Sequence, residues 1–133
     1  MNIVDTSGWL EYFADTPQAR HFAAAIEDTG TLLVPSIVLY EVFKKILLAF
    51  DENKAFQAVA QIKQGRVVDV DEAVALYAGK ISIEKKLPMA DALIYATAIL
   101  HHATVYTQDA HFEGLPQVRY FAKLLAPVPR NRV

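Results

Sequence analysis

The chain has 133 residues, a formal net charge of −2 at pH 7 and no cysteine. This length fits one domain with one core, and the lack of cysteine excludes disulfides, zinc–thiolate sites and thiol chemistry. The near-neutral charge excludes a global basic field that would draw the protein onto nucleic acid, whereas a hydrophobic content of 53% suggests apolar surface reserved for a partner.

Short apolar runs alternate with longer segments of helical periodicity, and turn or capping residues separate them. We expect strands at residues 3–4, 32–34, 66–70, 104–107 and 118–121. We expect helices at residues 9–14, 17–28, 37–49, 52–65, 72–86 and 89–101, with Thr16, Ser36, Asp51 and Asp71 as N-caps. This alternation predicts an α/β fold with a parallel sheet covered by helices on both faces.

No linker or internal repeat divides the chain, so we expect one domain over residues 1–125 and a loose basic tail over residues 126–133. The longest apolar stretch, residues 32–50, is interrupted by Glu41 and two lysines and is not expected to span a membrane. The N-terminus shows no basic flank followed by an apolar signal core. We expect a cytoplasmic protein, and the lack of cysteine is compatible with that location.

Two acidic residues directly follow strands, since Asp5 closes the first apolar run and Asp109 follows the fourth. Glu41 and Asp91 lie instead within two strongly apolar helical patterns, where a carboxylate is expensive to bury alone. In parallel sheets, ligands bind beyond the carboxyl ends of the strands, at the point where the strand order reverses. If the first and fourth strands are neighbours at that point, Asp5 and Asp109 meet there.

Carboxylates that converge raise one another's pKa and need a proton or a cation to coexist. A hard divalent ion with oxygen ligands, Mg²⁺ or Mn²⁺, is the usual partner. Each acid also has a structural explanation on its own: Asp5 can cap a helix, Asp109 can be a turn residue, and Asp91 suits a helix N-terminus. Glu41 can face water at one edge of its helix. Four acids in matching contexts favour a metal site over four separate explanations.

Four motifs carry a resemblance to a known family. They are Asp5-Thr6-Ser7 after the first strand, Ser36 with Glu41 five residues later, residues 87–94 (LPMADALI) with residues 96–98 (ATA), and residues 107–112 (TQDAHF). In this order and spacing, over roughly the first nine-tenths of the chain, they resemble PIN-domain nucleases of the VapC toxin type.

The resemblance implies a parallel sheet in the order 3-2-1-4-5 and an acidic quartet that binds Mg²⁺ or Mn²⁺, with two hydroxyl residues in support. The quartet is Asp5, Glu41, Asp91 and Asp109, and the supporting residues are Ser7 and Thr107. It implies a metal-dependent endoribonuclease that hydrolyses RNA phosphodiester bonds as the toxin of a type II toxin–antitoxin pair. The implied partners are RNA, a small antitoxin protein and a second copy of the chain in a homodimer.

Two departures from the family pattern concern substrate recognition more than metal binding: Gln108 stands where many relatives carry a basic residue, and Tyr95 replaces a commonly small residue. His111, two residues beyond Asp109, could contact substrate, although a structural role is the expected one. Phe112 is expected to fill space beneath the loop. The residues that could hold an RNA backbone are Lys44, Lys45, Lys80, Lys85 and Lys86, although a solvated helix face is expected for any one of them.

Two further classes of function stay open. A phospho-acceptor signalling domain would need Asp69, after the third strand, as the acceptor and would leave Glu41 and Asp91 unexplained; the adjacent acidic residues favour a solvated turn at Asp69. A catalytically silent scaffold of the same fold would need no quartet at all.

Apolar side chains also predict an interface. The helices at residues 17–28 and 37–50 carry more of them than one sheet face needs, which predicts a groove for an amphipathic partner helix. The alternative is that these two helices pack against each other.

Overall fold

The computed structural model describes residues 1–124, so the tail expected over residues 126–133 lies outside the described residues. The strands are β1 (Asn2–Val4), β2 (Leu32–Pro35), β3 (Arg66–Val68), β4 (Thr104–Thr107) and β5 (Val118–Tyr120). The α-helices are α1 (Thr6–Ala14), α2 (Arg20–Glu27), α3 (Ser36–Ala49), α4 (Glu52–Ile62), α5 (Glu72–Lys85) and α6 (Met89–Leu100). Short 3-10 turns are η1 (Pro17–Ala19), η2 (Thr29–Thr31) and η3 (Ala110–Phe112).

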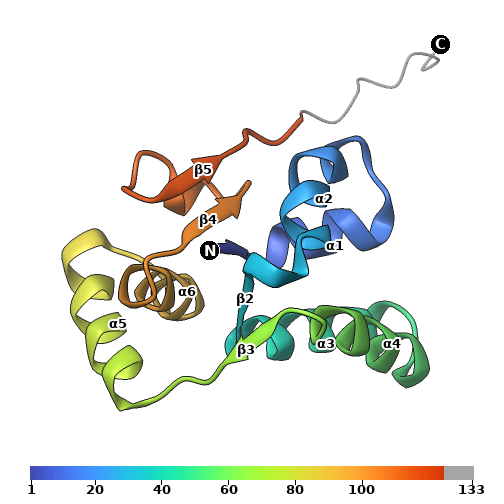
Figure 1. Cartoon of the computed structure of the whole chain (residues 1–133), viewed down its shortest axis with the longest axis horizontal. Coiled ribbons are helices and arrows are strands. Elements are labelled where there is room, and N and C mark those ends of the chain that lie inside the picture. Colours follow the sequence, from blue (N-terminus) through green and yellow to red (C-terminus); the bar gives the residue numbers. More distant parts are fainter. Residues whose placement is uncertain (125–133) are drawn as a thin grey trace, which may run out of the picture.

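All the strands pair in parallel in one sheet, in the order β3-β2-β1-β4-β5 (Figure 1). This confirms the predicted α/β class and strand order. The central strand is β1, where Ile3 pairs with Leu33 of β2 on one side and with Val105 of β4 on the other. The order reverses at this strand, so its carboxyl end is where a ligand site is expected.

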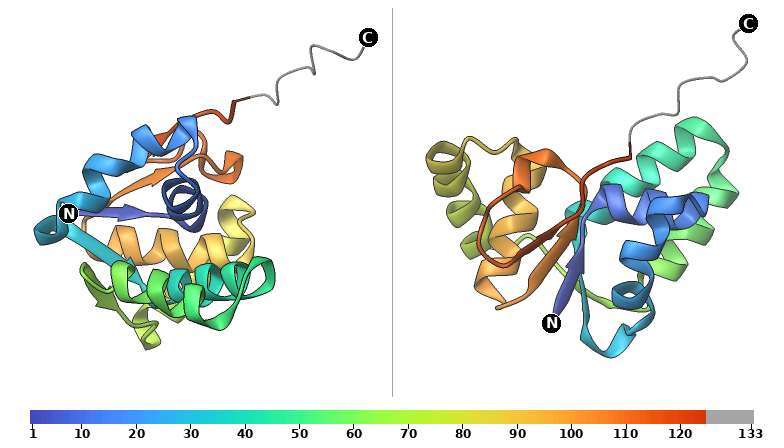
Figure 2. Two further views of the ribbon diagram at one scale, coloured as in Figure 1. Left: turned by 90° about the vertical axis from the view of Figure 1, so that its right-hand side faces the viewer. Right: turned by 90° about the horizontal axis from the view of Figure 1, so that it is seen from above.

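Helices cover both faces of the sheet, with α5 and α6 on one side and α1 and α2 on the other (Figure 2). The central strands read as continuous apolar runs because both of their faces are covered; Ile3, Val4 and Val34 are each 0% exposed. Helix α6 packs closely on the sheet through small residues, and Ala92, Ala96 and Ala98 are all buried.

Gly8 allows α1 to pack tightly beside β1. A Cβ atom at this position would lie 2.6 Å from Val4 Cγ1 and 2.7 Å from the Phe22 ring, closer than carbon atoms can approach. Helix α1 begins directly after β1, so this packing also fixes the position of the junction residue Asp5.

Several predicted boundaries were wrong for local reasons. The first helix begins at Thr6 rather than residue 9, because Asp5 caps it directly. The helix predicted at residues 17–28 is divided into η1 and α2, since the turn begun by Pro17 is of the tighter 3-10 type. The predicted cap by Ser36 was also wrong: Pro35 precedes α3 without a side-chain cap, and Ser36 Oγ accepts from Val70 N at 3.3 Å instead.

Two predicted ends fall short of expectation, because β3 ends at Val68 and the helix predicted to residue 65 ends at Ile62. No α-helix within residues 1–124 combines the length and apolarity needed to cross a bilayer.

Candidate active site

Asp5 lies at the carboxyl end of the central strand and is only 3% exposed. Its Oδ1 accepts hydrogen bonds from Ser7 Oγ at 2.7 Å and from Gly8 N at 3.1 Å, and its Oδ2 accepts from Thr107 Oγ1 at 2.9 Å. The bond from Gly8 N is a helix cap, so the structural explanation of Asp5 is correct as far as it goes. The bond from Thr107 is a second link, which joins β1 to β4 at the carboxyl edge of the sheet.

Asp109 is held to the same network through Thr107. The Thr107 hydroxyl donates to Asp5 and accepts from Asp109 N at 2.9 Å. Asp109 then caps η3 by accepting from His111 N at 2.9 Å. These bonds hold the loop after β4 at Thr107 and again at Asp109, and they place the Asp109 carboxylate beside that of Asp5.

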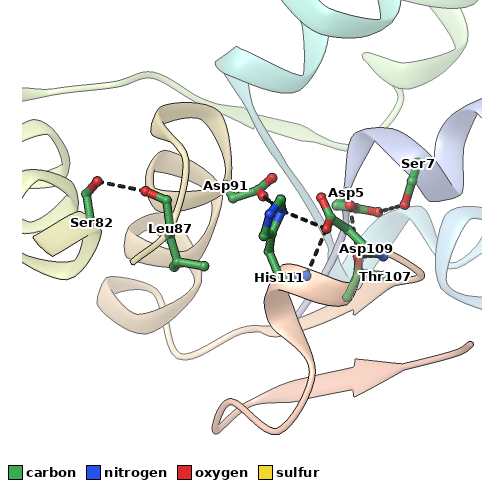
Figure 3. Close-up of polar contacts among 8 residues, drawn as sticks. All are labelled: Asp5, Ser7, Ser82, Leu87, Asp91, Thr107, Asp109 and His111. Carbon is green, nitrogen blue, oxygen red and sulfur yellow. Dashed lines mark hydrogen bonds and ion pairs between the residues drawn. The ribbon is translucent and has the colours of Figure 1, made fainter. Parts of the chain in front are cut away.

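Asp91 reaches the site from the first turn of α6, on the far side of His111 from Asp5 (Figure 3). The start of α6 is fixed by the connection from α5, where Lys86 takes a left-handed conformation with φ of 56° and Ser82 Oγ donates to Leu87 O at 2.7 Å. Asp91 does not cap its helix, since Pro88 precedes α6 without a side-chain cap. The side chain, 13% exposed, points to the loop after β4 instead.

His111 lies between the carboxylate of Asp91, on α6, and that of Asp109, in the loop after β4. Its Nδ1 is 3.0 Å from Asp91 Oδ2 and 3.0 Å from Asp109 Oδ1. One ligand atom from each of these three residues lies within 4.8 Å of the others. From the sequence, a structural role was expected for His111 ahead of contact with substrate, although its spacing of two residues from Asp109 was a signal for this arrangement.

Glu41 stands apart from that group of three residues. It lies on α3, and its Oε1 accepts from Thr6 Oγ1 at 2.5 Å. Because Thr6 follows Asp5, this bond links α3 to the β1–α1 junction. The structure therefore brings Asp5, Asp91 and Asp109 together and places Glu41 at the edge of the cluster through one hydroxyl.

Burial and mutual repulsion disfavour the ionised forms of the clustered carboxylates when no cation is bound. Burial raises the pKa of Asp5 from 3.8 to about 6, although hydrogen bonds from hydroxyl and amide groups oppose the rise. Burial followed by the neighbouring Asp109 raises the pKa of Asp91 to about 7. Within residues 1–124, no lysine or arginine forms an ion pair with these carboxylates. A divalent cation with oxygen ligands fits this donor set.

Residues 3–117 match the family model described as PIN domain. The chain belongs to the PIN-domain family. No curated protein matches the sequence.

Solved structures share the fold at low sequence identity. A toxin–antitoxin complex from Klebsiella pneumoniae has a TM-score of 0.76 and 22% identity, over 92% of this chain and 100% of that one. DNA-bound VapBC from Salmonella typhimurium has a TM-score of 0.74 and 21% identity, over 92% and 98% of the two chains. The sarcin–ricin-loop-cleaving toxin VapC20 of Mycobacterium tuberculosis has a TM-score of 0.71 and 20% identity, over 84% and 92%.

Gln108, one of the two departures from the family pattern, is a buried part of this PIN domain. It is 4% exposed, and its Oε1 accepts from Gln18 Nε2 at 3.0 Å. Gln18, 5% exposed, also donates to Ala122 O at 3.2 Å. This amide pair ties η1 to the loop that carries Asp109 and to the segment after β5. A role in the position of that loop therefore fits Gln108 better than contact with substrate.

The raised pKa values predict that this PIN domain, freed of metal by EDTA, is more stable at pH 5 than at pH 7.5. The native state keeps protons on Asp5 and Asp91 up to pH of about 6 and 7, whereas the unfolded chain releases them near pH 4. Stability is therefore lost as the pH rises from about 4 to about 7. Asp91→Asn should raise the stability at pH 7.5 by about 1–3 kcal/mol and weaken the pH dependence.

Thermal unfolding followed by circular dichroism at the two pH values measures both effects. Asp69→Asn is the matched control, because Asp69 is exposed beyond β3. A wild-type melting temperature that is unchanged or higher at pH 7.5 would contradict the repulsion inferred at the site.

Proposed function

We propose that this PIN domain is a metal-dependent endoribonuclease that acts as the toxin of a type II toxin–antitoxin pair in the cytoplasm. The observation that carries the proposal is the convergence of Asp5, Asp91 and Asp109 at the carboxyl edge of the central strands, with raised pKa values and no ion-paired lysine or arginine within residues 1–124. The likeness in fold to VapBC complexes and to an RNA-cleaving toxin supports this assignment.

The residues that would hold Mg²⁺ or Mn²⁺ are Asp91 and Asp109, with Asp5 and Glu41 beside them. Such an ion supplies positive charge to a phosphate and lowers the pKa of a nearby water. The chain's own contribution is orientation. Three donors fix the Asp5 carboxylate, and Thr107 holds Asp5 and Asp109 in register with each other. These contacts support the role that the resemblance implies for Ser7 and Thr107.

The surface beside Glu41 suits an RNA backbone. A hollow there is lined by one face of α3, including Tyr40, Lys44 and Lys45. Lys44 Nζ lies 5.6 Å from the centre of the exposed Tyr40 ring, so cationic and aromatic surface adjoin the acidic site. Lys80 lies instead on a solvated face of α5, where it pairs with Glu84 at 3.9 Å.

The competing phospho-acceptor function is not favoured by the geometry. Its acceptor would be Asp69, which lies beyond the edge strand β3 and is exposed. Strand β2 separates β3 from β1, so Asp69 and Asp5 do not share one site. A catalytically silent scaffold, in contrast, would be recognised by its failure to cleave RNA.

We expect the purified chain to cleave RNA in Mg²⁺ or Mn²⁺ and to lose this activity in EDTA. Asp91→Asn should lower cleavage by at least about 100-fold while the fold is retained, because an uncharged amide keeps the shape of the side chain but not its affinity for a cation. The measurement is cleavage of total cellular RNA with mapped ends. Asp69→Asn is the control and should cleave like the wild type. Cleavage that persists in EDTA, or full activity in Asp91→Asn, would contradict the proposed site.

An apolar groove offers a place for the antitoxin. Its volume is about 500 Å³. Leu10 and Phe13 of α1, Ile46 of α3, Ala58 of α4 and Phe50, which directly follows α3, are among the residues that line it, as are Lys45 and Lys54. The predicted surplus on the helix at residues 17–28 was wrong, because Phe22, Ala25 and Ile26 are all buried. Phe50, in contrast, is 66% exposed and is available to an amphipathic segment.

A second apolar surface lies on α5. Leu76 is 69% exposed and Ile83 is 83% exposed, and a spacing of seven residues puts them on one face of the helix. We assign this face to the homodimer that the resemblance implies.

The two surfaces predict opposite effects of two substitutions. Phe50→Asp should abolish co-purification with a small protein encoded beside this gene and should leave the mass of the isolated chain unchanged. Leu76→Asp should keep the small partner but shift the isolated chain towards the monomer, since a charge in an apolar interface is costly. Pull-down and light scattering measure the two outcomes. A stable monomeric wild type would contradict the dimer, and retention of the partner by Phe50→Asp would contradict the groove.

A further inference from the structure

We propose that His111 is a nitrogen ligand of the metal site and makes this chain favour Mn²⁺ and other imidazole-binding ions over Mg²⁺. The inference rests on the proposed function only in taking a divalent ion to be held between Asp91 and Asp109. It gives His111, an exposed residue of η3, a direct role in which ion the site selects.

The spacing of the three donor atoms supports this assignment. His111 Nδ1 lies 3.0 Å from Asp91 Oδ2 and 3.0 Å from Asp109 Oδ1. Adjacent ligand atoms of an octahedral ion with bonds of about 2.1 Å are about 3 Å apart. One nitrogen thus stands at the separation of a neighbouring ligand from two carboxylate oxygens that come from different elements, α6 and the loop after β4.

The position of His111 is fixed by packing beneath it. Its backbone N–H donates to Asp109 Oδ1 at 2.9 Å, which closes the turn of η3. The next residue, Phe112, is 0% exposed and packs edge-on against the Tyr95 ring, with centroids 6.3 Å apart. Tyr95 is four residues after Asp91 and so lies on the same face of α6. Its hydroxyl donates to Pro116 O at 2.9 Å, which holds the far side of the loop to α6.

This packing gives Tyr95, the second departure from the family pattern, a physical role. Because Tyr95 supports Phe112, the turn that carries His111 is held against the start of α6, where Asp91 lies. The imidazole is therefore held next to both carboxylates by the packing of Phe112 on Tyr95 and by the turn of η3. The His111 side chain remains 55% exposed, so an ion can reach it from solvent.

Ligand chemistry decides which ions gain from a nitrogen donor. Mg²⁺ prefers oxygen ligands and retains its water, whereas imidazole suits transition metals, whose affinities rise from Mn²⁺ to Co²⁺. A site of carboxylates alone would discriminate less between Mg²⁺ and Mn²⁺. A nitrogen ligand should therefore raise the affinity for Mn²⁺ and Co²⁺ and leave that for Mg²⁺ nearly unchanged.

Electron spin-echo modulation of the Mn²⁺-loaded protein tests the bond directly, because a coordinated imidazole couples ¹⁴N to the metal. The wild type should show this nitrogen signal and His111→Ala should lose it. Calorimetric titration should show that His111→Ala lowers the affinity for Mn²⁺ and Co²⁺ by about tenfold or more, with a much smaller change for Mg²⁺. His101→Ala is the control, since His101 is at the other end of α6, about 15 Å along the helix from Asp91.

A wild type without the nitrogen signal would overturn the inference, as would a signal that persists in His111→Ala. So would an equal loss of affinity for all three ions, which is expected if His111 only neutralises the two carboxylates. RNA cleavage is scored separately. Cleavage without a nitrogen signal would refute the role of His111 and leave the proposed nuclease activity standing. A nitrogen signal without cleavage would support the role of His111 and contradict the nuclease activity. A failure to bind any ion would contradict both.

Discussion

The structure depends on one electrostatic constraint, which is that like charges are brought together at the carboxyl edge of the central strands. Asp5 and Asp91 have raised pKa values because burial and neighbouring carboxylates both disfavour the ionised form. A fold that needed only stability would not retain this arrangement. A cation that stabilises the charged form turns the repulsion into affinity, and this ties the geometry of the site to the proposed function.

The rest of the fold holds the charges in place. The parallel sheet puts the ends of β1 and β4 side by side, and the Thr107 hydroxyl connects the two acids that follow them. The buried pair of Gln18 and Gln108 ties the loop after β4 to η1. The acids on helices are positioned less directly. Asp91 depends on the connection between α5 and α6, where Ser82 donates to Leu87 O, and Glu41 is linked to the site through Thr6.

Much of this arrangement could be predicted from the sequence, because the pattern of apolar runs and caps determines where strands end. Asp5 and Asp109 follow strands whose neighbouring positions were expected and are confirmed by the sheet order. The acids on helices were recognised because a lone charge within an apolar pattern is conspicuous. The structural explanations of Asp5 and Asp109 were also correct, since each caps the turn that follows it, and a capping role does not exclude a second one.

The role of His111 could not be predicted in the same way. It depends on the packing of Phe112 against Tyr95, a contact between residues 17 positions apart by number that neither periodicity nor capping rules specify. The division of residues 17–28 into η1 and α2 had a similar cause, since pattern alone does not separate a 3-10 turn from the first turn of an α-helix. Side-chain contacts between elements, rather than the elements themselves, were the part that sequence reasoning missed.

The most direct test of the central claim is the melting temperature of the wild-type chain as Mn²⁺ or Mg²⁺ is added at pH 7.5. An ion that binds only the native state stabilises it by mass action. If the carboxylates form a cation site, the melting temperature should rise with the logarithm of the ion concentration, by roughly 5–10 °C at about 100 times the dissociation constant. A melting temperature that does not respond to millimolar concentrations of either ion would contradict the claim that these carboxylates form a cation site.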